Sequence, residues 1–79
     1  MPTVLTFRGH RFFFYSNENK EPPHIHVENA ENYAKFWLDP VKVVDWSGYN
    51  APEIRELQKL IEANRTLMLK EWNDFFESI

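Results

Sequence analysis

The first two-thirds of the chain alternates apolar and polar residues in short runs, a pattern typical of β-strands. Five runs are rich in β-branched and aromatic residues and are separated by polar, Gly- or Pro-containing breaks. These runs are residues 3–7, 11–15, 24–28, 33–38 and 41–46. The segment Arg8-Gly9-His10 predicts a tight hairpin between the first two runs, and Asp39-Pro40 ends the fourth. The pattern therefore predicts four to five short strands.

The spacing of apolar residues changes to three and four after residue 50, which is typical of an amphipathic helix. The stripe consists of Ile54, Leu57, Ile61, Met68, Trp72, Phe75 and Ile79. Asn50 is placed to cap the helix, with Glu53 three residues later as in a capping box and Pro52 in the first turn. Asn64 and Arg65 interrupt the stripe, so the helix is either continuous or bent into two segments there.

Strands followed by a helix indicate an α+β fold, with an antiparallel sheet of four to five short strands and a C-terminal helix over one face. We expect a single domain over residues 1–79, with strands and loops in 1–49 and the helical segment in 50–79. The alternation assigns the helix-covered face to Phe12, Phe14, Ile25, Val27, Ala34, Phe36 and Leu38. The opposite face then carries Arg11, Phe13, Tyr15, His24, His26, Glu28, Tyr33, Lys35 and Trp37. Because imidazole and ammonium groups are costly to bury, we expect this second face to be open to solvent.

Composition excludes several classes of site. There is no cysteine, which rules out disulfides, thiolate zinc sites and thiol nucleophiles. The net charge is −3, and neither the strand-rich nor the helical part is basic, which argues against strong non-specific nucleic-acid binding. The sequence shows neither a charged leader nor an apolar stretch long enough to span a bilayer, so we expect a soluble cytoplasmic protein without membrane contact.

The most informative motif is Pro22-Pro23-His24-Ile25-His26-Val27. Alternate residues of a strand share a face, so His24 and His26 are predicted to lie side by side. This pair is a candidate for binding a divalent metal, with Glu28 or His10 as a third ligand. Two histidines are too few for a working site, so we expect no cofactor and favour hydrogen bonds from the imidazoles to nearby backbone.

Two further kinds of chemistry fit the same face. His24 or His26, together with Arg11 or Lys35, are candidate catalytic groups for cleavage of an RNA phosphodiester, with imidazoles transferring protons and a cation stabilising the developing charge. Alternatively the face binds unpaired bases or a partner protein through aromatic and cationic side chains. The candidate binding residues are His24, His26, Tyr33, Lys35, Trp37 and Tyr15. The acidic net charge favours a protein partner, and a homodimer through this face or through Phe76 or Ile79 is a further alternative.

The chain resembles the small bacterial domain-of-unknown-function family 4160. The segments that carry the resemblance are Met1-Pro2-Thr3-Val4, residues 12–15, the Pro-Pro-His-Ile-His-Val signature, residues 33–40, Asn64-Arg65 and residues 70–76. The resemblance implies a bacterial or mobile-element source and a gene beside another small domain of unknown function, similar to a toxin–antitoxin pair. It implies no settled activity and assigns a match only to Pro23, His24 and His26.

The residues and the resemblance together predict a binding or regulatory module in a toxin–antitoxin-like gene pair. It would engage a small partner protein encoded by an adjacent gene, or RNA, through the sheet face around His24 and His26. The alternative is an enzyme, either a histidine-dependent ribonuclease-type toxin or a small metal-dependent hydrolase. The sequence leaves open whether the protein is catalytic.

Overall fold

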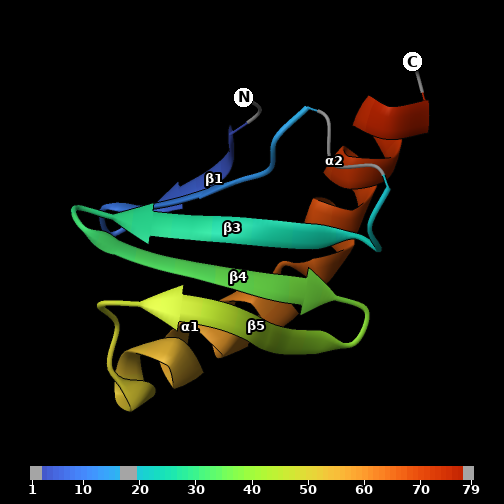
Figure 1. The fold of residues 1–79 in the computed structure, drawn as a ribbon. Coiled ribbons are helices and arrows are strands. Elements are labelled where there is room, and N and C mark those ends of the chain that lie inside the picture. The colour runs from blue at the N-terminus through green and yellow to red at the C-terminus, as the bar shows by residue number, and fades with distance from the viewer. Residues whose placement is uncertain (1–2, 17–19, 78–79) are drawn as a thin grey trace.

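The protein is an α+β fold in which a five-stranded antiparallel sheet is followed by two helices (Figure 1). The computed structural model describes residues 3–16 and 20–77. The strands are β1 (Thr3–Phe7), β2 (His10–Phe13), β3 (His24–Asn29), β4 (Asn32–Leu38) and β5 (Val41–Ser47). The helices are α1 (Ala51–Ala63) and α2 (Arg65–Glu77). The predicted fold class is therefore confirmed.

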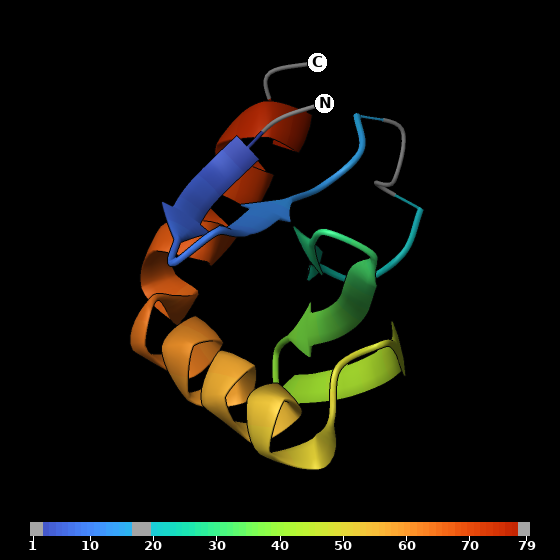
Figure 2. The ribbon, with the colours of Figure 1, turned by 90° about the vertical axis from the view of Figure 1, so that its left-hand side faces the viewer.

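The sheet is a simple meander in which each strand pairs with its neighbour in the chain, in the order β1-β2-β3-β4-β5. The predicted hairpin between β1 and β2 forms with positive φ at Arg8 and Gly9 (50° and 84°), and Ala30 (φ 54°) takes the same region between β3 and β4. Figure 2 shows that the sheet is strongly curved and wraps around the two helices, with β1 and β2 bent towards α2. This curvature brings distant parts of the chain to the same end of β3.

The helical segment is two helices rather than one, which answers the question that the sequence left open. Asn64 has φ −112° and ψ 15°, and its side-chain amide donates to the carbonyl of Leu60 at 2.8 Å. An Asn side chain that bonds to backbone competes with the helical pattern and favours a break. Arg65 fixes the new direction because its Nε donates to the carbonyl of Leu38 (2.7 Å) and its Nη2 contacts Asp39 (2.7 Å).

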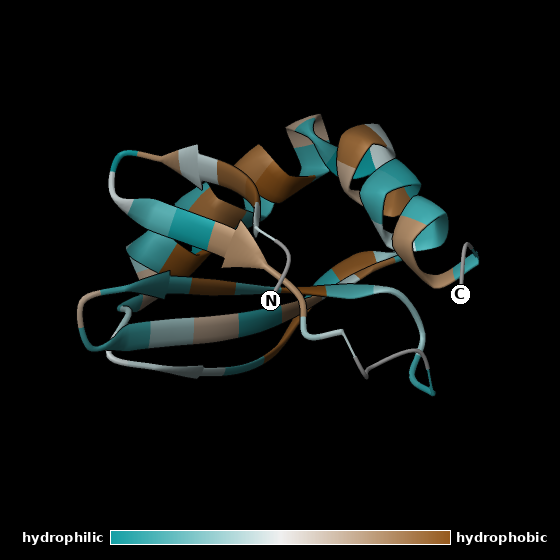
Figure 3. Ribbon diagram, turned by 90° about the horizontal axis from the view of Figure 1, so that it is seen from above, coloured by the Kyte–Doolittle hydropathy of each residue, from teal (hydrophilic) through white to brown (hydrophobic). Residues whose placement is uncertain are grey.

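The core lies between the concave face of the sheet and the two helices. All seven residues assigned to the helix-covered face are buried there, as predicted. Figure 3 shows the corresponding alternation of hydrophobic and hydrophilic bands along the strands and helices. The helices contribute Ile54, Leu57, Ile61, Met68 and Trp72, with Phe75 and Phe76 partly buried beside them. Ile79, the last member of the predicted stripe, and Met1-Pro2 of the resemblance lie outside the described residues.

The N-terminus of α1 has the predicted capping box. The backbone N–H of Glu53 donates to Oδ1 of Asn50, and the N–H of Asn50 donates to Oε1 of Glu53, both at 2.9 Å. Replacing Asn50 by Ala removes the first of these bonds from an exposed helix end, and we expect it to lower the free energy of unfolding by about 1 kcal/mol. Chemical denaturation with urea measures this loss, and an unchanged midpoint would contradict the assigned role of the cap.

Candidate functional site

The two histidines of the central motif are buried, which corrects the expectation that they face solvent. His24 is 0% exposed and His26 is 4% exposed. The predicted alternation itself is right, because Ile25 and Val27 pack in the core while the register places His24 opposite Trp37 and His26 opposite Lys35. The alternation therefore predicts the correct face of the strand, but the expectation that solvent surrounds the two imidazoles is wrong.

Aromatic rings from the two neighbouring strands, β2 with its C-terminal end and β4, enclose His26. Its ring stacks on Phe13 at a centroid distance of 5.3 Å and on Tyr33 at 5.8 Å, and the ring of Tyr15 meets it edge-on at a centroid distance of 5.0 Å. Nδ1 of His26 is 2.8 Å from the hydroxyl of Tyr33. The imidazole is therefore held as one layer of an aromatic stack. The hydrogen bond with the Tyr33 hydroxyl satisfies Nδ1 of His26, which would otherwise be costly to bury.

His24 lies beyond the last paired residue of β2, and a side chain of α2 encloses it instead. β2 ends at Phe13, which pairs with His26, so among the described residues no β2 partner lies beside His24 on that side. Trp72 of α2 reaches this end of the sheet, and its ring lies 4.8 Å from the imidazole of His24. Nδ1 of His24 donates to the carbonyl of Pro22 at 3.0 Å, the backbone bond favoured by the sequence, since a carbonyl can only accept.

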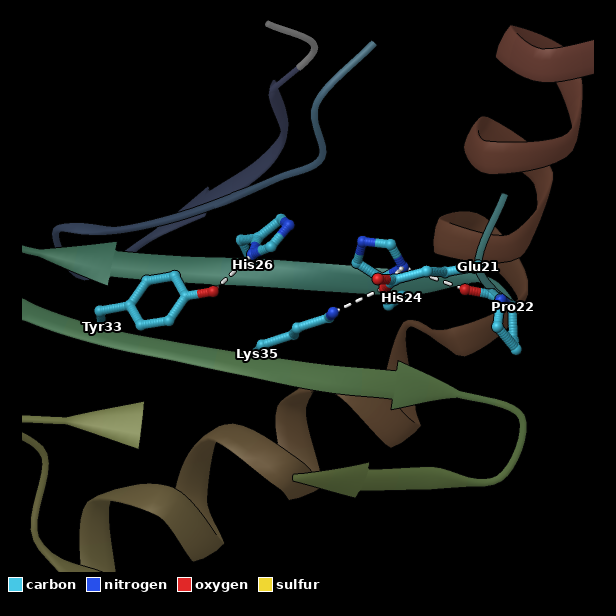
Figure 4. A network of polar contacts seen from close by, with 6 residues as sticks. All are labelled: Glu21, Pro22, His24, His26, Tyr33 and Lys35. Atoms are coloured by element: carbon cyan, nitrogen blue, oxygen red, sulfur yellow. Dashed lines mark hydrogen bonds and ion pairs between the residues drawn. The ribbon is translucent and has the colours of Figure 1, made fainter. Parts of the chain in front are cut away.

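Glu21 connects the loop before β3 to the sheet. Its Oε1 accepts from Nζ of Lys35 at 2.6 Å and lies 3.7 Å from Nδ1 of His24 (Figure 4). Lys35 also lies over the ring of Trp37, with Nζ 5.0 Å from its centroid. No sequence pattern predicts a role for Glu21. The only available signal was its position directly before the double proline, which holds the chain extended towards β3.

Arg11, the other candidate cation, is likewise paired. It lies opposite Glu28 in the sheet, and its Nε donates to Oε1 of Glu28 at 3.0 Å. The guanidinium also lies 4.2 Å from the centroid of Phe13. Arg11 and Lys35 therefore form two separate sites. Each cation is bonded to a carboxylate and lies over a different aromatic ring, and neither is directed at an imidazole.

Part of this side of the sheet stays accessible, and we call it the open face. It comprises Tyr15, which is 43% exposed, and the partly exposed side chains of Tyr33, Lys35, Trp37, Arg11 and Glu28. Both helices pack mainly on the opposite side of the sheet, in the core, and Trp72 of α2 also reaches His24 at one end of β3. The open face is therefore a surface of rings and internal ion pairs, supported from below by the two buried histidines.

The described residues do not complete a metal site around the candidate pair. His24 and His26 are perpendicular neighbours with ring centroids 5.1 Å apart. Of the two residues considered as a third ligand, Glu28 bonds to Arg11 and His10 contacts the hydroxyl of Tyr49. Over residues 3–16 and 20–77, no group of three or more histidine, aspartate or glutamate side chains is placed to hold an ion.

Tyr49 is a buried residue with a polar hydroxyl that no sequence pattern predicts, since it falls in the break between β5 and α1. Its hydroxyl is 2.9 Å from Nδ1 of His10, so it joins the start of β2 to the segment directly before α1. Burial raises the pKa of Tyr49 to about 12, and the nearby carboxylates of Glu53 and Glu28 contribute to the increase.

This raised pKa predicts a pH dependence of stability. Because the folded-state pKa lies above the unfolded value near 10, the folded protein binds this proton more tightly, and stability falls as the pH rises from about 10 to about 12. Urea denaturation across this range measures the fall. We expect it to be smaller in Tyr49→Phe, and an equal fall in both proteins would contradict the prediction.

The fold and site define a class: a small α+β protein whose curved meander sheet holds two helices on its concave side and an aromatic, ion-paired face on the other. The chain belongs to the family described as domain of unknown function (DUF4160), whose model matches residues 9–73. Comparison of the chain with the curated proteins and with the solved structures found no match. Neither helix in the described part of the chain has the length and apolar character needed to cross a membrane.

Proposed function

We propose that the protein is a binding module that engages a partner protein through the open face. The observation that carries this proposal is the display of Tyr33 and Trp37 on β4, with Tyr15 just beyond the end of β2, on the side of the sheet opposite the helix-packed core. Tyr and Trp supply large contact areas at low entropic cost and dominate the energetics of protein interfaces. Strand β4 presents Tyr33 and Trp37 without the ordering cost that a loop would incur.

The charges of the open face favour a protein over RNA. Phosphate binding needs cations that are free to neutralise the backbone. Here Arg11 is bonded to Glu28 and Lys35 to Glu21, so the two cations are balanced by two carboxylates. A neutral surface of rings and preformed ion pairs is instead suited to a protein interface, where charges are paired and aromatic residues are enriched.

The two histidines act in this proposal as supports and not as contact residues. His26 fixes the hydroxyl of Tyr33, and His24 packs against the ring of Trp37 at 5.8 Å. Side chains that are held in place before binding lose less entropy when the complex forms. The histidines of the Pro-Pro-His-Ile-His-Val motif thus contribute to binding indirectly, because they position the rings of Tyr33 and Trp37.

The partner that we propose is the small protein encoded beside this gene, in a toxin–antitoxin-like pair of bacterial origin. This part of the proposal rests on membership of the family and on the arrangement that the resemblance implies.

Burial makes the alternative, a histidine-dependent ribonuclease, the weaker proposal. A general acid or base must come within hydrogen-bond reach of the substrate. Both imidazoles lie under rings, and Nε2 of His24 is inaccessible to solvent. We therefore favour binding over catalysis.

The test is calorimetric titration of the purified protein with the product of the adjacent gene, and separately with single-stranded RNA. We expect saturable binding to the protein and none to the RNA at physiological salt. Binding to RNA alone, or RNA cleavage that is lost in a His24→Ala/His26→Ala double variant, would contradict the proposal.

A further inference from the structure

β5 forms one edge of the sheet and carries unusually exposed apolar side chains. It pairs with β4 only, so within the described residues its other edge has no strand partner. Val44 is 42% exposed and Trp46 is 49% exposed. Proteins seldom leave a seven-residue edge strand with large apolar side chains uncovered, because such an edge is a template for another strand.

A bulge in β5 places its two charged side chains on the same side of the sheet. Lys42 pairs with Trp37 and Asp45 pairs with Lys35, while Val44 is the extra residue between them. Without the bulge, residues 42 and 45 would point to opposite faces, since strand side chains alternate. With it, a cation and an anion stand near each other on one face of the edge.

We propose that the β5 edge binds a second copy of this chain, antiparallel and across a two-fold axis, to form a continuous ten-stranded sheet. An axis perpendicular to the sheet keeps the faces of both copies aligned, so paired residues must share a face. In the register that opposes residue 42 to residue 45, each Lys42 meets the Asp45 of the other copy. Val41 then meets Trp46, and both of these residues lie on the helix side, opposite Leu38 and Ala34.

Other registers are less favourable for the same strand. Shifting the pairing by three residues in one direction places Lys42 opposite Lys42, and in the other direction Asp45 opposite Asp45. Like charges directly opposed across strands are destabilising, whereas opposite charges stabilise the pair. The edge is therefore self-complementary in one register, which is why the occupant that we infer is a second copy and not an unrelated strand.

The same features have a competing explanation, because lysine and bulges also protect edges from unwanted pairing. A protective lysine does not require an aspartate in the matching position of a second copy. The two explanations differ in what charge reversal does, and this difference sets the experiment.

The test is sedimentation equilibrium of the purified protein alone, so its outcome does not depend on the proposed function. We expect the wild type to dimerise, and Lys42→Asp and Asp45→Lys each to weaken the dimer about tenfold or more, because each places like charges at two positions. An equimolar mixture of the two variants should recover wild-type affinity, since both of its cross-strand pairs are again opposite in charge. Lys59→Glu, an exposed charge reversal on α1, is the matched control and should leave the dimer unchanged.

A wild type that stays monomeric at the highest soluble concentration would overturn the proposal, as would a mixture that associates no better than its components. Circular dichroism of each variant confirms that it is folded before its association is measured.

Discussion

Replacing His24 by Ala is expected to lower the free energy of unfolding by about 2–4 kcal/mol. The side chain is fully buried, and its ring packs against Trp72, Trp37 and His26. Truncation leaves a cavity between the end of the sheet and α2. It also removes the donor to the carbonyl of Pro22, which adds the cost of a lost hydrogen bond. Urea denaturation monitored by tryptophan fluorescence measures the change.

Two further variants separate packing from hydrogen bonding at this position. His24→Asn keeps a donor near the position of Nδ1 but loses ring volume, while His24→Leu fills more of the space but cannot donate. We expect both to be more stable than His24→Ala and less stable than the wild type. A loss below about 0.5 kcal/mol in His24→Ala, the level of an ordinary surface substitution, would show that the imidazole is not a structural support.

Replacing Trp37 by Ala is expected to weaken binding of the partner protein by about 2 kcal/mol or more, which is roughly thirtyfold in Kd. Trp37 lies at the end of β4 on the open face, where Lys35 packs over one side of its ring and His24 meets its edge. A partly exposed ring held in this way is typical of the residues that dominate interfaces. Titration calorimetry with the product of the adjacent gene measures the loss.

The matched control is Leu67→Ala, which removes an exposed apolar side chain from α2, outside the open face. It should bind with wild-type affinity. Trp37→Phe keeps an aromatic ring and should lose less affinity than Trp37→Ala, so a general loss of folding can be distinguished from a loss of contact. Equal affinities for Trp37→Ala and the wild type would remove Trp37 from the binding surface.

The elements of the fold were predictable because their signals are local. Alternation located the strands and assigned their faces, and the capping box located the start of α1. The end of β2 was misplaced, since residues 14 and 15 have strand-like side chains but lie beyond the last paired residue, Phe13. Phe14 is nevertheless buried in the core, which shows that an apolar side chain can fill the core without belonging to a strand.

The surroundings of the site were not predictable, because they depend on parts of the chain that are distant in sequence. His24 is buried by Trp72, whose position follows from the curvature of the sheet and from the break at Asn64. Glu21 acquires its role only when the chain before β3 folds back towards Lys35. Alternation identifies which side chains share a face, and it cannot indicate what later covers that face.

The most direct test of the open face as the binding surface is hydroxyl-radical footprinting of side chains, with and without the product of the adjacent gene. We predict that Tyr15, Tyr33 and Trp37 lose reactivity in the complex, while Phe7 and Leu67, which are exposed elsewhere on the protein, keep theirs. Protection of Phe7 or Leu67 with unchanged reactivity at Tyr33 and Trp37 would contradict the account.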